Sequence, residues 1–246
     1  MTRTIPSPNL WNHPEVYAQE NAAQDVDGAI WQALREEAPW TGADVLDVGC
    51  GDGFHLPVFA REAASVTGVE PHPPLVRRAR RRGLRVLEAG AEALPLPDAS
   101  VDLVHARTAY FFGPGCEPGL VEAQRVLRPG GAIAIVDLDA TVDPYGSWMR
   151  TDIPHYDPVR AERFFERLGF TTRRIATRWE FPDRATRDAV LRIEFSPAVA
   201  DRAIAATPGL TLPVGYRLHV RRRPDPRRPD PRRRDLSPES AARLRR

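Results

Sequence analysis

The segment VLDVGCGDGFHLPVFA, residues 45–60, contains the residue types best suited to holding a ligand. A run of branched apolar residues leads into the glycine-rich stretch GCGDG (49–53), where a turn without side chains lets a ligand approach the backbone closely. Asp47 and Asp52 add two carboxylates to this turn. Because a carboxylate repels a pyrophosphate, we expect the turn to favour a ligand that carries an ammonium or another cation.

The spacing of the turn also argues against two phosphate-binding motifs. A dinucleotide-binding turn follows G-x-G-x-x-G, and Phe54 occupies the last glycine position here. A P-loop ends in Gly-Lys-Ser/Thr, and the chain contains no lysine. Glu70 stands 21 residues after Gly49, close to the interval of about 20 at which an acidic residue binds ribose hydroxyls. A cation acceptor beside a ribose-binding carboxylate fits S-adenosylmethionine, which combines an amino acid, a sulfonium and an adenosine.

Short apolar strands alternate with helical segments, which is typical of a parallel sheet covered on both faces. The expected strands are residues 44–48, 65–70, 84–89, 101–106, 131–139, 171–181 and 212–220. The expected helices are 13–38, with a possible break at Asp27-Gly28, then 53–63, 73–82, 117–128, 158–168 and stretches near 184–206. Ligands of open α/β sheets bind at the carboxyl ends of the strands, so the glycine turn is the leading candidate site.

Four segments occur in a familiar order: VLDVGCGDG, VTGVEP, AGAEALPLPDASVDLVHA and RVLRPGGAIAIVD. With them the chain resembles the class I S-adenosylmethionine-dependent methyltransferases of the small-molecule type, with a methyltransferase-11-like domain. The resemblance covers about residues 42–140. It implies a Rossmann-like methyltransferase fold of the α/β class, with a doubly wound, mostly parallel seven-stranded sheet and helices on both faces, in three αβα layers.

The same resemblance implies S-adenosylmethionine as the cofactor and indicates which residues contact it. These expected cofactor-binding residues are Asp47, Gly49, Cys50, Gly51, Glu70, Pro71, Ala91, Glu92 and His105. Asp47 and the turn would hold the methionine portion, Glu70 the ribose, and Ala91 with Glu92 the adenine. Asp47 could instead only cap its own turn, and Cys50 could be a small filler residue.

The acceptor side has separate candidates. The candidate general bases, needed if the acceptor must lose a proton, are His105, His155 and Tyr156. The candidate substrate contacts are Arg107, Tyr110 and Tyr17. Each has a structural alternative, since His105 could be packed with both nitrogens satisfied and the tyrosines could belong to the core. No metal is expected, because the histidines and carboxylates show no ligand spacing around the site.

Charge is distributed unevenly along the chain. Residues 221–246 contain eleven arginines and four acids, whereas the remaining residues contain 24 arginines and 29 acids. We therefore expect an N-terminal helical cap (1–40), an S-adenosylmethionine-binding core (41–140), a segment completing the sheet and substrate side (141–220), and a disordered Arg/Pro-rich tail (221–246). Two cysteines and the lack of about 18 consecutive apolar residues indicate a cytoplasmic protein without a membrane span.

The expected function is methyl transfer to an O, N or C atom of a small molecule by in-line displacement. The arginine-rich tail leaves open an RNA or protein methyltransferase, although the acidic body and the lack of aromatic residues in the tail make nucleic acid an unlikely partner. A cofactor-binding protein without transferase activity and an NAD-dependent oxidoreductase are further alternatives. The sequence does not indicate the acceptor or the oligomeric state.

Overall fold

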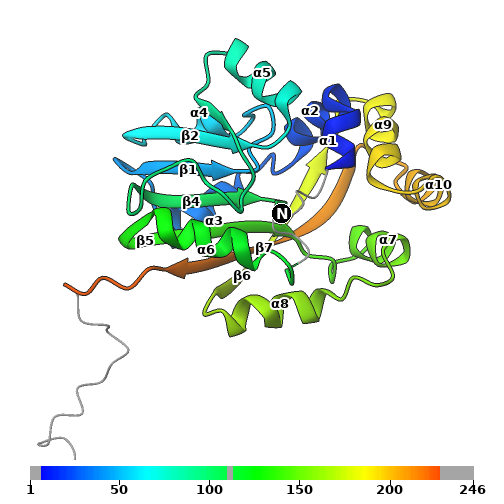
Figure 1. Cartoon of the computed structure of the whole chain (residues 1–246). Coiled ribbons are helices and arrows are strands. Elements are labelled where there is room, and N and C mark those ends of the chain that lie inside the picture. Colours follow the sequence, from blue (N-terminus) through cyan, green and yellow to red (C-terminus); the bar gives the residue numbers. More distant parts are fainter. Residues whose placement is uncertain (1–6, 110–112, 228–246) are drawn as a thin grey trace, which may run out of the picture.

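A central sheet organises the protein, whose computed structural model describes residues 7–109 and 113–227 (Figure 1). Within these residues the sheet has seven strands: β1 (Asp44–Val48), β2 (Ser65–Glu70), β3 (Val86–Glu88), β4 (Val101–Arg107), β5 (Leu127–Leu138), β6 (Thr171–Glu180) and β7 (Thr211–Arg222). Their order is β3-β2-β1-β4-β5-β7-β6. The neighbours among β1 to β5 pair in parallel, whereas β7 runs antiparallel to both β5 and β6.

Helices cover both faces of the sheet. Successive residues of the buried strands point to opposite faces, and the residues on both faces are apolar. The helices are α1 (Pro8–Asn12), α2 (Pro14–Ala23), α3 (Ala29–Glu37), α4 (Leu56–Phe59), α5 (Pro73–Arg81), α6 (Glu117–Val126), α7 (Tyr145–Asp152), α8 (Pro158–Arg167), α9 (Arg184–Glu194) and α10 (Pro197–Ala206). On one face, Leu34 of α3 and Phe59 of α4 pack with Leu103 of β4. On the other, Leu120 of α6 and Phe165 of α8 pack with residues of β1 and β5. The expected fold class is therefore confirmed.

The possible break at Asp27-Gly28 in the expected helix 13–38 is confirmed: the segment is divided into α2 and α3, because Gly28 adopts the left-handed conformation with φ 71° just before α3. Several other expected element boundaries are wrong. The expected helix 53–63 is reduced to α4, since Gly53 is also left-handed, with φ 82°. The short helices α1 and α7 were not expected. Strand β7 continues to Arg222, so the first two residues assigned to a disordered tail belong to the sheet.

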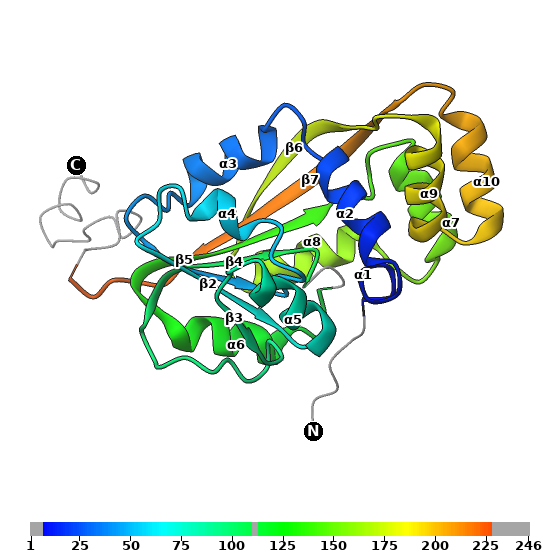
Figure 2. The same cartoon turned by 90° about the horizontal axis from the view of Figure 1, so that it is seen from above.

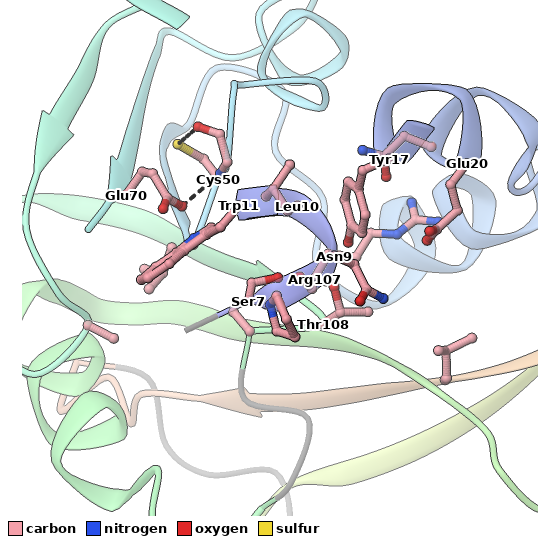
Figure 3. A pocket seen from close by; sticks show the side chains of 18 of the residues that line it. Ser7, Asn9, Leu10, Trp11, Tyr17, Glu20, Cys50, Glu70, Arg107 and Thr108 are labelled. Atoms are coloured by element: carbon pink, nitrogen blue, oxygen red, sulfur yellow. Dashed lines mark hydrogen bonds between the residues drawn. The ribbon is translucent and has the colours of Figure 1, made fainter. Parts of the chain in front are cut away.

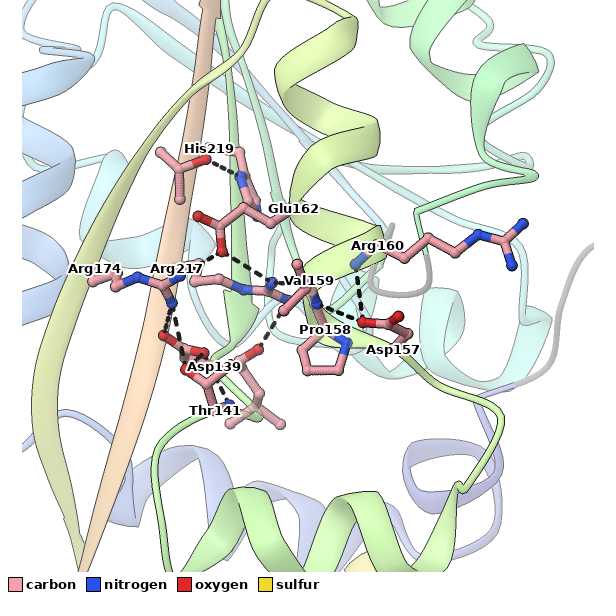
Figure 4. A network of polar contacts seen from close by, with 12 residues as sticks. Asp139, Thr141, Asp157, Pro158, Val159, Arg160, Glu162, Arg174, Arg217 and His219 are labelled. Carbon is pink, nitrogen blue, oxygen red and sulfur yellow. Dashed lines mark hydrogen bonds and ion pairs between the residues drawn. The ribbon is translucent and has the colours of Figure 1, made fainter.

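A buried arginine attaches β7 to the segment before α8. Arg217 is fully buried, its Nη1 donates to the carbonyl oxygen of Pro158 at 2.8 Å, and its Nη2 donates to the hydroxyl of Tyr156 at 2.7 Å. Figure 4 shows this arginine beside Glu162 and Arg174, whose side chains are paired at 2.6 Å. The network fixes the start of α8 and the segment before it to the antiparallel strands rather than to the glycine turn.

Five helices gather at the carboxyl ends of β4 and β5. Figures 1 and 2 show α1, α2, α7, α9 and α10 together at this end of the molecule, and α9 contacts both α2 and α10. They bring residues from both ends of the sequence to the strand ends where the glycine turn lies. In the described part of the chain, none of the helices combines the length and the apolar character that crossing a membrane requires.

Candidate active site

The turn after β1 is built from glycines because its backbone adopts conformations that other residues avoid. Gly49 has φ 72° and Gly51 has φ 58°. A Cβ atom on Gly49 would lie 2.8 Å from the Cβ of Ala109, closer than real side-chain contacts allow. The backbone N–H groups of Gly49 and Cys50 donate to the carbonyl oxygen of Val69, at 2.8 and 3.1 Å. The turn is thus fastened to the end of β2.

Glu70, at the end of β2, closes one side of this turn. Its Oε2 accepts a hydrogen bond from the backbone N–H of Gly51, and its Oε1 accepts one from the N–H of His72, both at 3.0 Å. The side chain is 97% buried. Burial raises the pKa of the Glu70 carboxyl, while the hydrogen bonds from the backbone of His72 and Gly51 act in the opposite direction. The carboxyl group is therefore held in one orientation beside the turn.

A cavity of about 480 Å³ extends from Glu70 to α1, α2, α7 and the end of α9. Figure 3 shows Glu70 and Cys50 on one side of this cavity, Tyr17 and Glu20 on the other, and Trp11 and Leu10 of α1 between them. The Trp11 ring stacks on His72, with ring centroids 4.4 Å apart and planes inclined by 10°. Helix α1 therefore covers the cavity where it passes the glycine turn.

The far end of the cavity, which we call the inner subsite, is formed by Glu20, Tyr145, Met149, Glu194 and Phe195. The hydroxyl of Tyr145 donates to Oε2 of Glu194, and the rings of Tyr145 and Phe195 lie 5.1 Å apart. Burial, and next the neighbouring Glu194 carboxylate, raise the pKa of Glu20 well above its usual range. Two carboxyl groups thus face an otherwise apolar and aromatic region.

The residues of the inner subsite are oriented by amides and an arginine. Nδ2 of Asn9 donates to Oε1 of Glu194 at 2.7 Å, and Nε2 of Gln24 donates to Oε1 of Glu20 at 2.8 Å. Arg107 in turn donates through Nη2 to the Gln24 side-chain oxygen at 2.6 Å. These contacts connect the end of β4 with α1, α2 and α9.

Asp47 and His105 pair with each other and do not line the cavity. Nδ1 of His105 lies 2.7 Å from Oδ1 of Asp47, and both side chains are at least 97% buried. The imidazole ring packs on Phe59 at 5.0 Å and on Trp31 at 6.4 Å. The pair joins β1 to β4 below the turn, a placement that corresponds to the packed alternative for His105 rather than to a side chain facing a methyl group.

The charge of Asp52 is compensated by arginines of α5. Its Oδ2 lies 3.1 Å from Nε of Arg78 and 3.3 Å from Nη1 of Arg82. A compensated carboxylate repels an anion only weakly, so the argument from Asp52 against diphosphate ligands does not hold. A different argument replaces it: the N–H groups of Gly49, Cys50 and Gly51, which a pyrophosphate would need, already donate within the protein.

The other expected site residues divide between the cavity and the rest of the fold. Those that line the cavity are Gly49, Cys50, Gly51, Glu70, Pro71, Ala91, Glu92, Arg107 and Tyr17. His155 is exposed and Tyr156 is buried against Arg217, and neither lines the cavity. Burial raises the pKa of Tyr156 to about 12, which makes it a poor base. Tyr110 lies outside the described residues.

Burial also raises the pKa of the Cys50 thiol well above its usual range. Cys50 therefore lines the cavity as a neutral thiol, consistent with the filler role considered for it. The described residues contain no group of three His, Cys, Asp or Glu side chains that could hold a metal ion.

The inner subsite was missed by the sequence analysis. Glu20 and Glu194 are 174 positions apart; Glu194 lies on an amphipathic helix, and Glu20 lies on a helix whose apolar residues form no clear face. A single charged residue on such a helix is usually solvent-exposed, so no local signal distinguishes these two. Only the packing of α2 on α9 brings them together.

The strand order and the glycine turn at the carboxyl end of β1 define a Rossmann-like fold of the methyltransferase type. Residues 46–135, from β1 to β5, match the family described as "Methyltransferase domain". This segment is therefore similar in sequence to a methyltransferase domain, as the resemblance implied.

Individual relatives agree with this assignment. A protein of Mycobacterium sp. (strain KMS), named an uncharacterized methyltransferase, is 35% identical over 143 residues, which make up 56% of this chain and 54% of that protein. The chain thus spans about half the length of the curated relatives it matches. The solved YcgJ protein of Bacillus subtilis superposes with a TM-score of 0.56 at 19% identity, covering 81% of this chain and 99% of that one.

A second solved structure is geranyl diphosphate C-methyltransferase from Streptomyces coelicolor A3(2), in complex with Mg²⁺, geranyl-S-thiolodiphosphate and S-adenosyl-L-homocysteine. It gives a TM-score of 0.54 at 16% identity and covers 80% of this chain and 76% of that one. At such identities the likeness concerns the fold.

Proposed function

We propose that the protein transfers a methyl group from S-adenosylmethionine to an O, N or C atom of a small molecule. The observation that carries this proposal is the Glu70 carboxyl group, held 3.0 Å from the backbone nitrogen of Gly51 at one end of the cavity. It occurs within the methyltransferase domain, and the cavity continues beyond it to a second polar region at the inner subsite.

The residues at this end of the cavity fit an adenosine that lacks phosphates. The Glu70 oxygens can accept ribose hydroxyls, and Pro71 and Ala91 offer apolar surface for a purine, with Glu92 beside it. The N–H groups of Gly49, Cys50 and Gly51 already have partners, which argues against a pyrophosphate cradle here. This pattern supports S-adenosylmethionine over a dinucleotide as the bound nucleoside.

S-adenosylmethionine supplies a methyl group that its sulfonium has already activated. What remains for the protein is to place the acceptor atom in line with the carbon–sulfur bond, and such positioning can lower a barrier by about 7–11 kcal/mol. The Glu70 and turn contacts hold one reactant, while α1, with Trp11, covers the cavity from solvent. The inner subsite is the part of the cavity that remains for the acceptor.

Binding of S-adenosylhomocysteine, measured by isothermal titration calorimetry, tests this proposal. We expect Glu70→Ala to weaken binding on the order of 100-fold, because a buried charge-assisted hydrogen bond is lost. Glu88→Ala is the matched control. This glutamate lies on β3 in register with Glu70 of β2, is exposed, and does not line the cavity. Micromolar binding of NADH, with no binding of S-adenosylhomocysteine, would contradict the proposal.

The acceptor can be sought with a labelled methyl group. Incubation of the protein with labelled S-adenosylmethionine and metabolite extracts is expected to label a small-molecule fraction. Repeating the reaction with RNA and with protein extracts as acceptors addresses the alternatives that the arginine-rich segment raises. Label that enters only macromolecules would argue against a small-molecule acceptor.

A further inference from the structure

We propose that the inner subsite binds the acceptor through a protonated amine attached to an apolar body, with Glu20 as the residue that selects it. This inference rests on the proposed methyl transfer and adds to it the chemical class of the acceptor. It is carried by an unpartnered oxygen atom and by the walls around it.

The unpartnered atom is Oε2 of Glu20. The side chain is 97% buried and lines the cavity, and among the described residues this oxygen has no hydrogen-bond donor other than a proton that Glu20 can share with the neighbouring Glu194 carboxyl group. Its companion Oε1 is occupied by Gln24, at 2.8 Å. A buried carboxyl oxygen without a donor is costly, so a ligand that brings an N–H or O–H group there is favoured.

The neighbouring charges favour a cation over a neutral donor. Both oxygens of Glu194 already accept hydrogen bonds, from Asn9 and from Tyr145, so this carboxylate stays in place beside Glu20. In a buried site one of two adjacent carboxyl groups holds a proton, unless another cation lies beside the pair and lets both ionise. An ammonium group takes the place of that proton and satisfies the free oxygen of Glu20.

Arg107 does not cancel this preference. Its Nη2 is used by Gln24, and its Cζ lies 5.4 Å from the centre of the Tyr216 ring, on the side of β7. It therefore fixes the amide that orients Glu20, and the lowering effect of its charge on the pKa of Glu20 is outweighed by burial and by Glu194. Asp152 adds a third acid to the cavity lining near this end.

The walls of the inner subsite determine the rest of the acceptor. Tyr145, Met149 and Phe195 are each at least 93% buried and line the cavity. Aromatic faces stabilise a cation in their vicinity and also cover apolar groups. The fitting ligand is consequently an amine with an aromatic or aliphatic body, not a sugar or a phosphate ester.

The test compares two probes of equal shape, 2-phenylethylamine and 2-phenylethanol, titrated into the full chain saturated with S-adenosylhomocysteine. We expect the amine to bind at least about tenfold more tightly than the alcohol, because its hydrogen bond to a carboxylate is charge-assisted. Glu20→Gln should reduce this ratio to about one, since the new amide can donate to Glu194 and closes the pair internally. Equal binding of the two probes to the unaltered protein would overturn the proposal.

Glu15→Gln is the matched control, because Glu15 lies on the same helix but is 77% exposed and paired with Arg78. It should keep the full preference for the amine. If Glu20→Gln loses its circular dichroism signal, Glu194→Gln provides the second test, with the same expected loss of preference. If the Glu20→Gln and Glu194→Gln variants are both folded and both retain the preference for the amine, the proposal is also overturned.

The outcome separates the two proposals. If S-adenosylhomocysteine does not bind, the proposed methyl transfer fails and the acceptor inference fails with it. If it binds but the amine has no advantage, only the acceptor inference fails.

Discussion

The two ends of the cavity are built in opposite ways. The cofactor end is formed by the glycine turn and Glu70, which lie within about 20 residues on two adjacent strands and are connected mainly through the backbone. The inner subsite takes Glu20 from α2, Tyr145 from α7 and Glu194 from α9, and its contacts are between side chains. Backbone contacts tolerate little change in conformation, whereas side-chain contacts can be exchanged for others without altering the fold. The first end therefore suits a cofactor common to many proteins, and the second an acceptor particular to one.

The largest expected difference between variants at the two ends of the cavity is in how much a bound cofactor product raises the free energy of unfolding. A ligand at 100 times its Kd adds about 2.7 kcal/mol to the free energy of unfolding. Gly49→Ala should lose this gain for S-adenosylhomocysteine, because the added Cβ meets Ala109 at 2.8 Å. Glu194→Gln should keep it, since the proposed cofactor contacts lie at the other end of the cavity.

Gly83→Ala separates crowding from backbone strain. Gly83 is also left-handed, with φ 77°, but a Cβ there meets nothing within 4 Å. Both alanine variants should lose stability without ligand, and Gly83→Ala should keep the gain from S-adenosylhomocysteine in thermal unfolding. A gain that survives in Gly49→Ala would show that the two ends do not differ as described.

At the buried pair of Asp47 and His105, we expect loss of the carboxylate to lower the free energy of unfolding by about 1–3 kcal/mol. Asp47→Ala removes the partner of the His105 ring nitrogen and leaves a buried polar atom unsatisfied. Asp47→Asn keeps an oxygen that can accept from the imidazole, so urea unfolding should show near-normal stability. If Asp47 contacts the cofactor through its charge, Asp47→Asn will instead retain stability and lose affinity for S-adenosylhomocysteine.

A smaller, pH-dependent effect is expected at Asp137, which resembles Glu20 in having unpartnered buried oxygens but does not line the cavity. Burial raises the pKa of Asp137 to about 7, while nearby Arg217 acts in the opposite direction. A raised native pKa means that the stability contribution of the bound proton is complete below the unfolded pKa of 3.8 and is lost as pH rises through about 7.

The Asp137→Asn variant has no carboxyl group at this position to titrate. The free energy of unfolding of the variant minus that of the unaltered protein should therefore increase from pH 5 to pH 8. The slope for one proton is at most about 1.4 kcal/mol per pH unit. Urea unfolding at the two pH values measures it. An unchanged difference between the proteins would indicate that the Asp137 carboxyl group does not titrate in this range.

The strand and turn residues could be predicted from the sequence because their signal is local. The glycines, the apolar strands and the interval to Glu70 all fall within residues 44–70, where the chain geometry fixes their relative positions. The pairing of Asp52 with Arg78 could not be predicted in the same way, because an arginine-rich helix ordinarily presents its charges to solvent. The inner subsite depended on how helices from both ends of the chain pack, which no spacing in the sequence encodes.

The position of β7, which runs antiparallel between β5 and β6, has a practical consequence. Since β7 ends at Arg222 opposite Ala132, at the amino ends of the parallel strands, the chain leaves the sheet on the side remote from the cavity. An affinity tag, a fluorophore or a surface linker joined after Arg227 would be attached at the end of the sheet remote from the cavity. Immobilised protein prepared in this way should remain accessible to every ligand used in the experiments above.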